Sequence, residues 1–236
     1  MNELLNFFTE PYQTASTLHI LLELIAAIFG VASVLYAKKE NILVFPTGIV
    51  STAIYVYLLA QWNLYGDLII NIYYTIMSIY GWIIWSKIID KEQHHIPITR
   101  TNLKDKLKTL GIFIFTSIFV IAVYRYYNVM PNHLNFTESV NYAYTNMISG
   151  NLEDFRKITP FLDTFTTGIF FAGMWLMANK KLENWIFWVV GNLVSIPLYF
   201  VKGFGFTGIQ YTIFLVLAIL GYHSWKKRLN KQKQIL

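Results

Sequence analysis

The sequence predicts an all-α integral membrane protein that crosses the bilayer seven times. Of its 236 residues, 55% are hydrophobic and 14% are charged, whereas a soluble domain carries about a quarter charged residues. The charges cluster between apolar runs that are each long enough to span the hydrocarbon layer as a helix. These runs lie near Leu18–Ala37, Ile42–Ala60, Asp67–Ser86, Leu110–Tyr127, Phe161–Ala178, Asn184–Val201 and Thr207–Trp225.

The first three runs resemble the last three, which indicates an internal repeat. Ala37–Asn41 resembles Ala178–Asn184, and Gly81–Lys87 resembles Gly221–Lys227. When Glu40-Asn41 is aligned with Glu183-Asn184, three further pairs of similar residues align: Phe45 with Trp188, Gly48 with Gly191, and Thr52 with Ser195. The fourth run has no counterpart.

The predicted organisation is therefore two three-helix repeats joined by a linker helix, a 3+1+3 arrangement. Three helices and a linker cross the membrane an even number of times, so both repeats enter from the same side and are parallel. Transporters of this kind bind substrate between the repeats. The expected segments are an extracytoplasmic N-terminus (1–17), the first repeat (18–86), the linker helix with its loops (87–160), the second repeat (161–225) and a basic cytoplasmic tail (226–236).

The distribution of Lys and Arg predicts the orientation. Four basic residues fall on the side of the N-terminus and fifteen on the other side. Cytoplasmic loops carry the excess of Lys and Arg. We therefore expect the N-terminus outside and the C-terminus in the cytoplasm.

A polar and aromatic stripe runs along the sixth run. Residues spaced by three and four share one face of a helix, and five such residues are Trp185, Trp188, Asn192, Ser195 and Tyr199. Lipid cannot satisfy hydrogen-bonding groups, so the stripe must face protein, water or a ligand. Packing between helices, with Asn192 and Ser195 bonded to a neighbour, is the alternative.

Similar stripes occur on three other runs. The third run carries Asp67, Asn71, Tyr74, Ser78 and Trp82, and the second carries Phe45, Gly48, Thr52 and Tyr55 beside Thr47; the seventh carries Thr207, Gln210 and Phe214 beside Tyr211. Each stripe alone also fits helix packing. Together they predict a pore lined by amides, hydroxyls and aromatic rings.

Charged groups within the spans are few. Glu23, about a turn inside the first run, is a candidate for ion coupling, although it also fits pairing with a cation or contact with interfacial water. Asp67 and Asp163 lie at helix starts, where the helix dipole stabilises a carboxylate. The chain has no Cys, and no set of catalytic residues can be assembled. We expect no enzymatic activity, no metal, no cofactor and no nucleic-acid partner.

The predicted lining suits a flat ring. Trp faces attract cations, and Asn and Gln present donor and acceptor together. No Lys or Arg lies deep in the spans, so a phosphorylated ligand would lack a charge partner. The residues favour an uncharged or cationic heteroaromatic molecule resembling a nucleoside.

Two motifs carry a family resemblance. Asn184-Trp185-Ile186-Phe187-Trp188 followed by Gly191-Asn192, and Asn71-Ile72-Tyr73-Tyr74 with Gly81-Trp82, resemble the PnuC family of bacterial vitamin transporters from about Leu18 to Trp225. The resemblance implies facilitated diffusion of nicotinamide riboside across the bacterial inner membrane, trapping by cytoplasmic phosphorylation, a SWEET-like but distinct topology and a homotrimer. It also allows thiamine or riboflavin as the cargo.

On that basis, Trp185 and Trp188 are expected to stack on or gate the ring. Hydrogen bonds would come from Asn192, Asn71 and Gln210, the walls from Tyr74, Tyr199, Tyr211, Phe45 and Thr47, and close helix approach from Gly48 and Gly191. The rival functions are a SWEET-type sugar carrier, a substrate-binding subunit that needs an ATPase partner, and a membrane enzyme.

Overall fold

Seven helices in the computed structural model are long and apolar enough to cross a membrane. The structure describes residues 16–61, 65–87, 96–203 and 205–235, so most of the predicted N-terminal segment lies outside the described residues. The seven helices are α2 (Thr17–Lys38), α3 (Val44–Gln61), α4 (Tyr65–Trp85), α5 (Leu103–Tyr126), α8 (Thr159–Ala178), α9 (Asn184–Val201) and α10 (Gly205–Ile235). Within the described ranges there is no strand apart from one isolated bridge, and the all-α class is confirmed.

Two helix boundaries and one loop differ from the sequence prediction. α5 begins at Leu103 rather than Leu110, because Asn102 and Asp105 form a reciprocal capping box that starts the helix early. α10 continues past Trp225 to Ile235, so the described part of the basic tail is helical. The loop after α5 holds two short helices, α6 (Phe136–Ile148) and α7 (Leu152–Lys157), and a second capping box starts α6.

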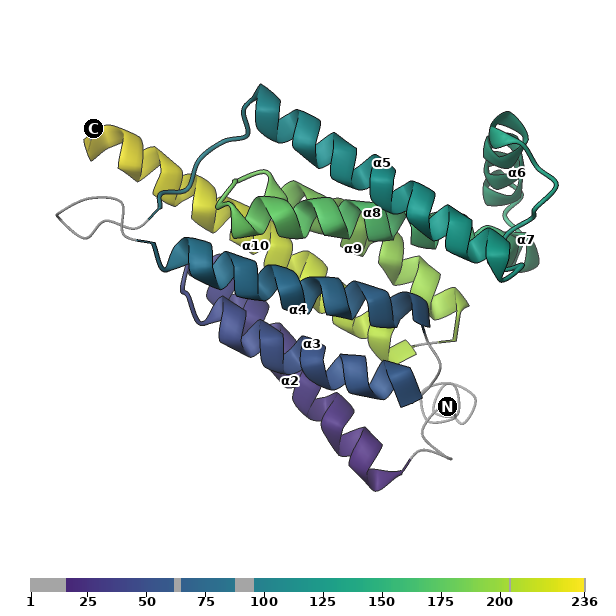
Figure 1. Cartoon of the computed structure of the whole chain (residues 1–236), viewed down its shortest axis with the longest axis horizontal. Coiled ribbons are helices and arrows are strands. Elements are labelled where there is room, and N and C mark those ends of the chain that lie inside the picture. The colour runs from purple at the N-terminus through teal and green to yellow at the C-terminus, as the bar shows by residue number, and fades with distance from the viewer. Residues whose placement is uncertain (1–15, 62–64, 88–95, 204, 236) are drawn as a thin grey trace.

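Six of the long helices form a closed ring. α2 packs on α3, α3 on α4, α4 on α8, α8 on α9, α9 on α10, and α10 returns to α2. α5 lies outside the ring against α8 (Figure 1). α8 is accordingly the most interior span: 61% of the residues in its apolar stretch are buried, against 6% in that of α2. The large apolar side chains that α2 and α5 leave exposed, such as Leu24 and Phe115, suit contact with lipid.

Corresponding positions in the two helical triplets lie 140 residues apart in the sequence. Glu40 and Lys180, which are 140 apart, follow α2 and α8 and both have positive φ. The Lys180 ammonium lies 2.9 Å from Glu40 Oε1, so these two turns meet at the same end of the molecule. α2 and α8 therefore end on the same side of the molecule.

The structure keeps the predicted pairing of Gly81 with Gly221 but changes that of Phe45 with Trp188. Phe45 covers Gly81, and Trp185 covers Gly221 in the same manner. Phe45 therefore corresponds to Trp185 and not to Trp188. The sequence pairing that set Glu40 over Glu183 is therefore shifted by three residues. It relied on the connecting turns, whose residues are constrained by backbone geometry more than by identity.

Candidate functional site

A cavity of about 910 Å³ lies inside the ring of helices. This volume falls within the range of about 300–1,000 Å³ that small-molecule sites occupy. All six ring helices and α5 contribute lining residues. The cavity is therefore a property of the assembled triplets, since no single helix pair encloses it.

The stripe predicted on α9 faces this cavity along its whole length. Trp185, Trp188, Asn192, Ser195 and Tyr199 all line it. α9 is uninterrupted through these positions, with Pro197 placed on its final turns. The 3.6-residue period of the helix thus carries the stripe along the cavity from Trp185 to Tyr199.

Aromatic rings form a continuous column along the cavity. Trp188 stacks on Phe170 with 5.5 Å between ring centroids, Phe170 stacks on Tyr211 at 6.0 Å, and Tyr211 stacks on Tyr199 at 4.9 Å. Tyr74 approaches Trp188 from α4 at 6.2 Å. Stacked rings at these distances offer flat faces to a planar or cationic ligand.

Phe170 was not predicted from the sequence, although a signal existed. Most of the α8 side chains that line the cavity recur at spacings of three and four along the helix, among them Asp163, Thr166, Thr167, Phe170, Met174 and Met177. This stripe mixes Thr, Phe and Met. It was therefore less conspicuous than the amide and Trp stripe of α9.

Polar groups inside the cavity are partly unsatisfied. Among the described residues, no hydrogen-bond partner is found for the buried atoms Ser195 Oγ and Trp185 Nε1. Ser195 is 1% exposed and Asn192 is 3% exposed. A buried hydroxyl without a partner is costly, so a ligand that bonds Ser195 would recover that cost.

Two more amides reach the cavity from other helices. Gln210 lines it from α10, and Asn71 lines it from α4. The Asn71 Nδ2 donates to the backbone carbonyl of Asp67 at 2.9 Å, which fixes the orientation of the side chain. The site thus combines amides, a hydroxyl and ring faces.

A charged group at the end of the cavity near Tyr199, here called its mouth, was not predicted. Lys202 lines the cavity, and its Nζ lies 2.6 and 2.7 Å from the two carboxylate oxygens of Asp163. Asp163 is not in the first turn of α8, so it is an ion-pair partner and not a helix cap. Asp67 does lie in the first turn of α4, where its Oδ1 also accepts a hydrogen bond from the Tyr199 hydroxyl at 3.4 Å.

Some predicted site residues lie elsewhere. Phe45 and Thr47 do not line the cavity; Phe45 is fully buried against Trp85, and the Thr47 hydroxyl donates to the carbonyl of Leu43 in its own helix. Gly191 is a close-packing position, because any Cβ there would collide with the ring of Phe170.

Two other predicted residues do line the cavity. Gly48 reaches it from α3 and packs close to Ser33. Glu23 lines it from α2 and is partly buried. The sequence stripes therefore place most, but not all, of the candidate residues around one space.

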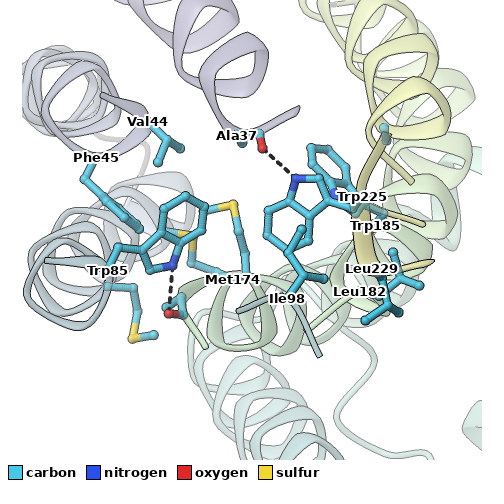
Figure 2. Packing of buried hydrophobic residues seen from close by; sticks show 14 residues of the cluster. Ala37, Val44, Phe45, Trp85, Ile98, Met174, Leu182, Trp185, Trp225 and Leu229 are labelled. Carbon is cyan, nitrogen blue, oxygen red and sulfur yellow. Dashed lines mark hydrogen bonds between the residues drawn. The ribbon is translucent and has the colours of Figure 1, made fainter. Parts of the chain in front are cut away.

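The end of the cavity near Trp185 is closed by a cluster of buried side chains (Figure 2). The indole N–H of Trp225 donates to the carbonyl of Ala37 at 2.8 Å, and that of Trp85 donates to the carbonyl of Ala178 at 3.1 Å. Trp185 meets Trp225 edge-on at 5.6 Å. Trp185 thus belongs both to the cavity wall and to this closure.

Comparison with known proteins shows the family. The sequence model of one family, described as nicotinamide mononucleotide transporter, matches residues 20–227. The chain belongs to this family. The protein is therefore a multi-pass membrane transporter and not an enzyme, and the cavity is its candidate substrate site.

Curated relatives are similar over nearly the whole chain. The nicotinamide riboside transporter PnuC of Escherichia coli is 21% identical over 208 residues, covering 86% of this chain and 84% of the relative. The PnuC protein of Neisseria mucosa, named likewise, is 23% identical over 214 residues, covering 88% of this chain and 72% of the relative. A shorter match, 30% identical over 63 residues, joins 27% of this chain to 30% of the riboflavin/roseoflavin transporter RibM of Streptomyces davaonensis.

The fold has been seen experimentally. The crystal structure of the vitamin B3 transporter PnuC matches with a TM-score of 0.63 at 20% identity, covering 89% of this chain and 83% of that chain. The seven-helix fold of this transporter is thus a known one.

Proposed function

We propose that this transporter imports nicotinamide riboside by facilitated diffusion with alternating access. The observation that carries the proposal is the aromatic column beside buried, partly unsatisfied polar groups in one cavity. Nicotinamide riboside has a flat cationic ring, a carboxamide and ribose hydroxyls. Each of these finds a complementary group in the lining.

The residues divide into two roles. Trp188, with Phe170 and Tyr74 close by, stacks on the pyridinium ring. Asn192 and Ser195 on α9, facing Gln210 and Asn71, bond the carboxamide and the ribose. Phe45 and Thr47 have no direct part, since they lie outside the cavity wall.

The direction of transport follows from the charges and the closed end. The cluster around Trp85 and Trp225 closes the end at which α2 and α8 finish. By the excess of Lys and Arg, that end faces the cytoplasm of a bacterial inner membrane. The cavity in this conformation then receives substrate from outside, and the N-terminus is external and the C-terminus cytoplasmic.

Three further features complete the proposal. Phosphorylation in the cytoplasm would trap the imported riboside and maintain its gradient. Glu23 is not needed for coupling if transport follows the gradient alone. The exposed apolar faces of the spans leave room for a homotrimer in the membrane.

The test is uptake of labelled nicotinamide riboside into liposomes that contain the purified protein, with and without a proton or sodium gradient. We expect uptake without a gradient, and competition by unlabelled riboside. Trp188→Ala and Asn192→Ala should each lower affinity about ten- to a hundredfold, the effect of losing about 1–3 kcal/mol. Trp82→Ala is the matched control, because Trp82 is 42% exposed and lies outside the cavity.

The same assay separates the rival functions. Preferred competition by riboflavin or thiamine would change the vitamin assigned, and preferred competition by glucose would indicate a sugar carrier. Binding without uptake would indicate a subunit that needs an ATPase partner. Normal uptake by both cavity variants would show that the site is wrong.

A further inference from the structure

The charged residues of the cavity are concentrated toward its outer mouth. In the part of the chain that the structure describes, the lining includes three carboxylates (Glu23, Asp67 and Asp163) and one ammonium group, that of Lys202. The formal charge of this lining is therefore negative. The deeper wall between Trp188 and Ser195 is neutral.

Lys202 is already engaged by the protein. Its Nζ contacts both oxygens of Asp163 at 2.6 and 2.7 Å and lies 5.4 Å from the ring centre of Tyr199. The side chains of Lys202 and Asp163 are 26% and 16% exposed, so water screens this pair only in part. An incoming phosphate would have to displace a carboxylate to bind this ammonium group.

Asp67 faces the same mouth from the opposite triplet. It accepts a hydrogen bond from Tyr199, the outermost ring of the aromatic column. The negative charge on Asp67 thus lies where the column opens. Inward from Tyr199, the buried hydroxyl of Ser195 has no partner among the described residues, and the proposed function places a ligand group at this level.

Distances along α9 set the scale of the interaction. Lys202 lies roughly 20 Å outward of Trp188 along the helix axis, at about 1.5 Å per residue. A ring stacked on Trp188 therefore does not touch the mouth. The carboxylates act on a cation through their electric field at the mouth of the cavity. Such a field raises the local concentration and the association rate of oppositely charged ligands.

We propose that Asp67 and Asp163 determine the charge specificity of the transporter. Asp67 attracts the positively charged ring toward the aromatic column. Asp163 holds Lys202, so that a phosphate group gains no ion pair at the mouth, and the transporter favours the riboside over the mononucleotide. This inference rests on the proposed function, and it assigns the selection to residues remote from the ring site.

The first test compares two ligands that differ in ring charge. Nicotinamide riboside is cationic, and its 1,4-dihydro form is uncharged and of nearly the same shape. In Asp67→Asn, the dissociation constant of the cationic form should rise about three- to tenfold, while that of the uncharged form should not change. Equal effects on both ligands would overturn the role of Asp67.

A matched control tests whether a carboxylate outside the cavity has the same effect on ligand affinity. Asp154 on α7 also pairs with a lysine, Lys157, at 2.6 Å, but it does not line the cavity. Asp154→Asn should leave the affinity of both ligands unchanged. A loss of affinity equal to that of Asp67→Asn would contradict a mouth-specific effect.

The second test asks whether Asp163 prevents Lys202 from binding a phosphate group. In Asp163→Asn, Lys202 is released, and competition by nicotinamide mononucleotide relative to the riboside should improve at least tenfold. The double variant Asp163→Asn with Lys202→Gln should lose that gain. An unchanged ratio in a folded Asp163→Asn protein, or a gain that survives removal of Lys202, would refute the proposal.

A measurement on the unmodified protein covers the case in which a variant fails to fold. Raising the salt concentration from about 20 to 500 mM shortens the Debye length, so binding of the cationic riboside should weaken severalfold and binding of the dihydro form should not. Equal salt responses would refute the field effect. Failure of the unmodified protein to bind the riboside at all would instead refute the proposed function.

Discussion

At the scale of single residues, Ser195 best separates a packing role from a ligand role. It lies on the α9 stripe, lines the cavity and is 1% exposed. Helix packing would have supplied its hydroxyl with a partner, and none is found among the described residues. Under the proposed function, the substrate supplies that partner.

We therefore expect Ser195→Ala to lower substrate affinity about two- to tenfold, the effect of one hydrogen bond of about 0.5–1.5 kcal/mol. The melting temperature should not fall, because no bond within the protein is lost. Binding by calorimetry and thermal unfolding in detergent measure the two effects. A lower melting temperature with unchanged affinity would assign Ser195 to the fold.

At the scale of helices, two glycines allow α3 to approach α4 and α9 to approach α10. A Cβ on Gly81 would collide with the ring of Phe45, and one on Gly221 would lie against the ring of Trp185. These glycines are needed for close packing, and both have helical backbone. The repeat therefore reuses one way of placing an aromatic ring on a neighbouring helix.

Gly81→Ala should destabilise the protein by about 1–3 kcal/mol, because the added methyl group forces a buried ring to move. Gly111→Ala on α5 is the matched control, since nothing lies within 4 Å of its Cβ. Alanine there should be neutral or stabilising by up to about 1 kcal/mol through helix propensity. Thermal unfolding of the two variants measures the difference, and similar values would show that the Phe45 contact relaxes freely.

At the scale of the whole molecule, two indole hydrogen bonds join the two triplets at the closed end of the cavity. Trp225 joins α10 to the end of α2, and Trp85 joins α4 to the end of α8. Both bonds cross between the triplets (Figure 2). In the alternating access proposed above, opening of this end would break both bonds, and their strength would then contribute to the balance between the two conformations.

Trp225→Phe removes one of these bonds and should favour the inward-open state by up to about tenfold, since a lost hydrogen bond is about 0.5–1.5 kcal/mol. The chain has no Cys, so a single Val34→Cys in the inner part of the cavity reports access. A membrane-impermeant thiol reagent added outside should label it more slowly in the Trp225→Phe background. Leu152→Cys, exposed on α7, should label equally in both backgrounds; an unchanged rate at position 34 would show that this bond does not control access.

Local patterns in the sequence were sufficient for the spans and for the α9 stripe. Hydropathy and a 3.6-residue period depend on neighbours within one helix, so the order of residues alone places Trp188, Asn192 and Ser195 on one face. The same reasoning failed for Phe45, because its stripe alone does not say whether it faces the cavity or a neighbouring helix.

The sequence by itself determined that the chain is a seven-helix membrane protein with an uncharged stripe of polar and aromatic residues on α9, because burial in lipid constrains composition residue by residue. Only the tertiary structure decided the register of the two triplets, the closure at Trp85 and Trp225, and the pairing of Lys202 with Asp163. These features join residues from 39 to 188 positions apart. Contacts over such separations depend on how helices pack around a shared cavity, which no local pattern encodes.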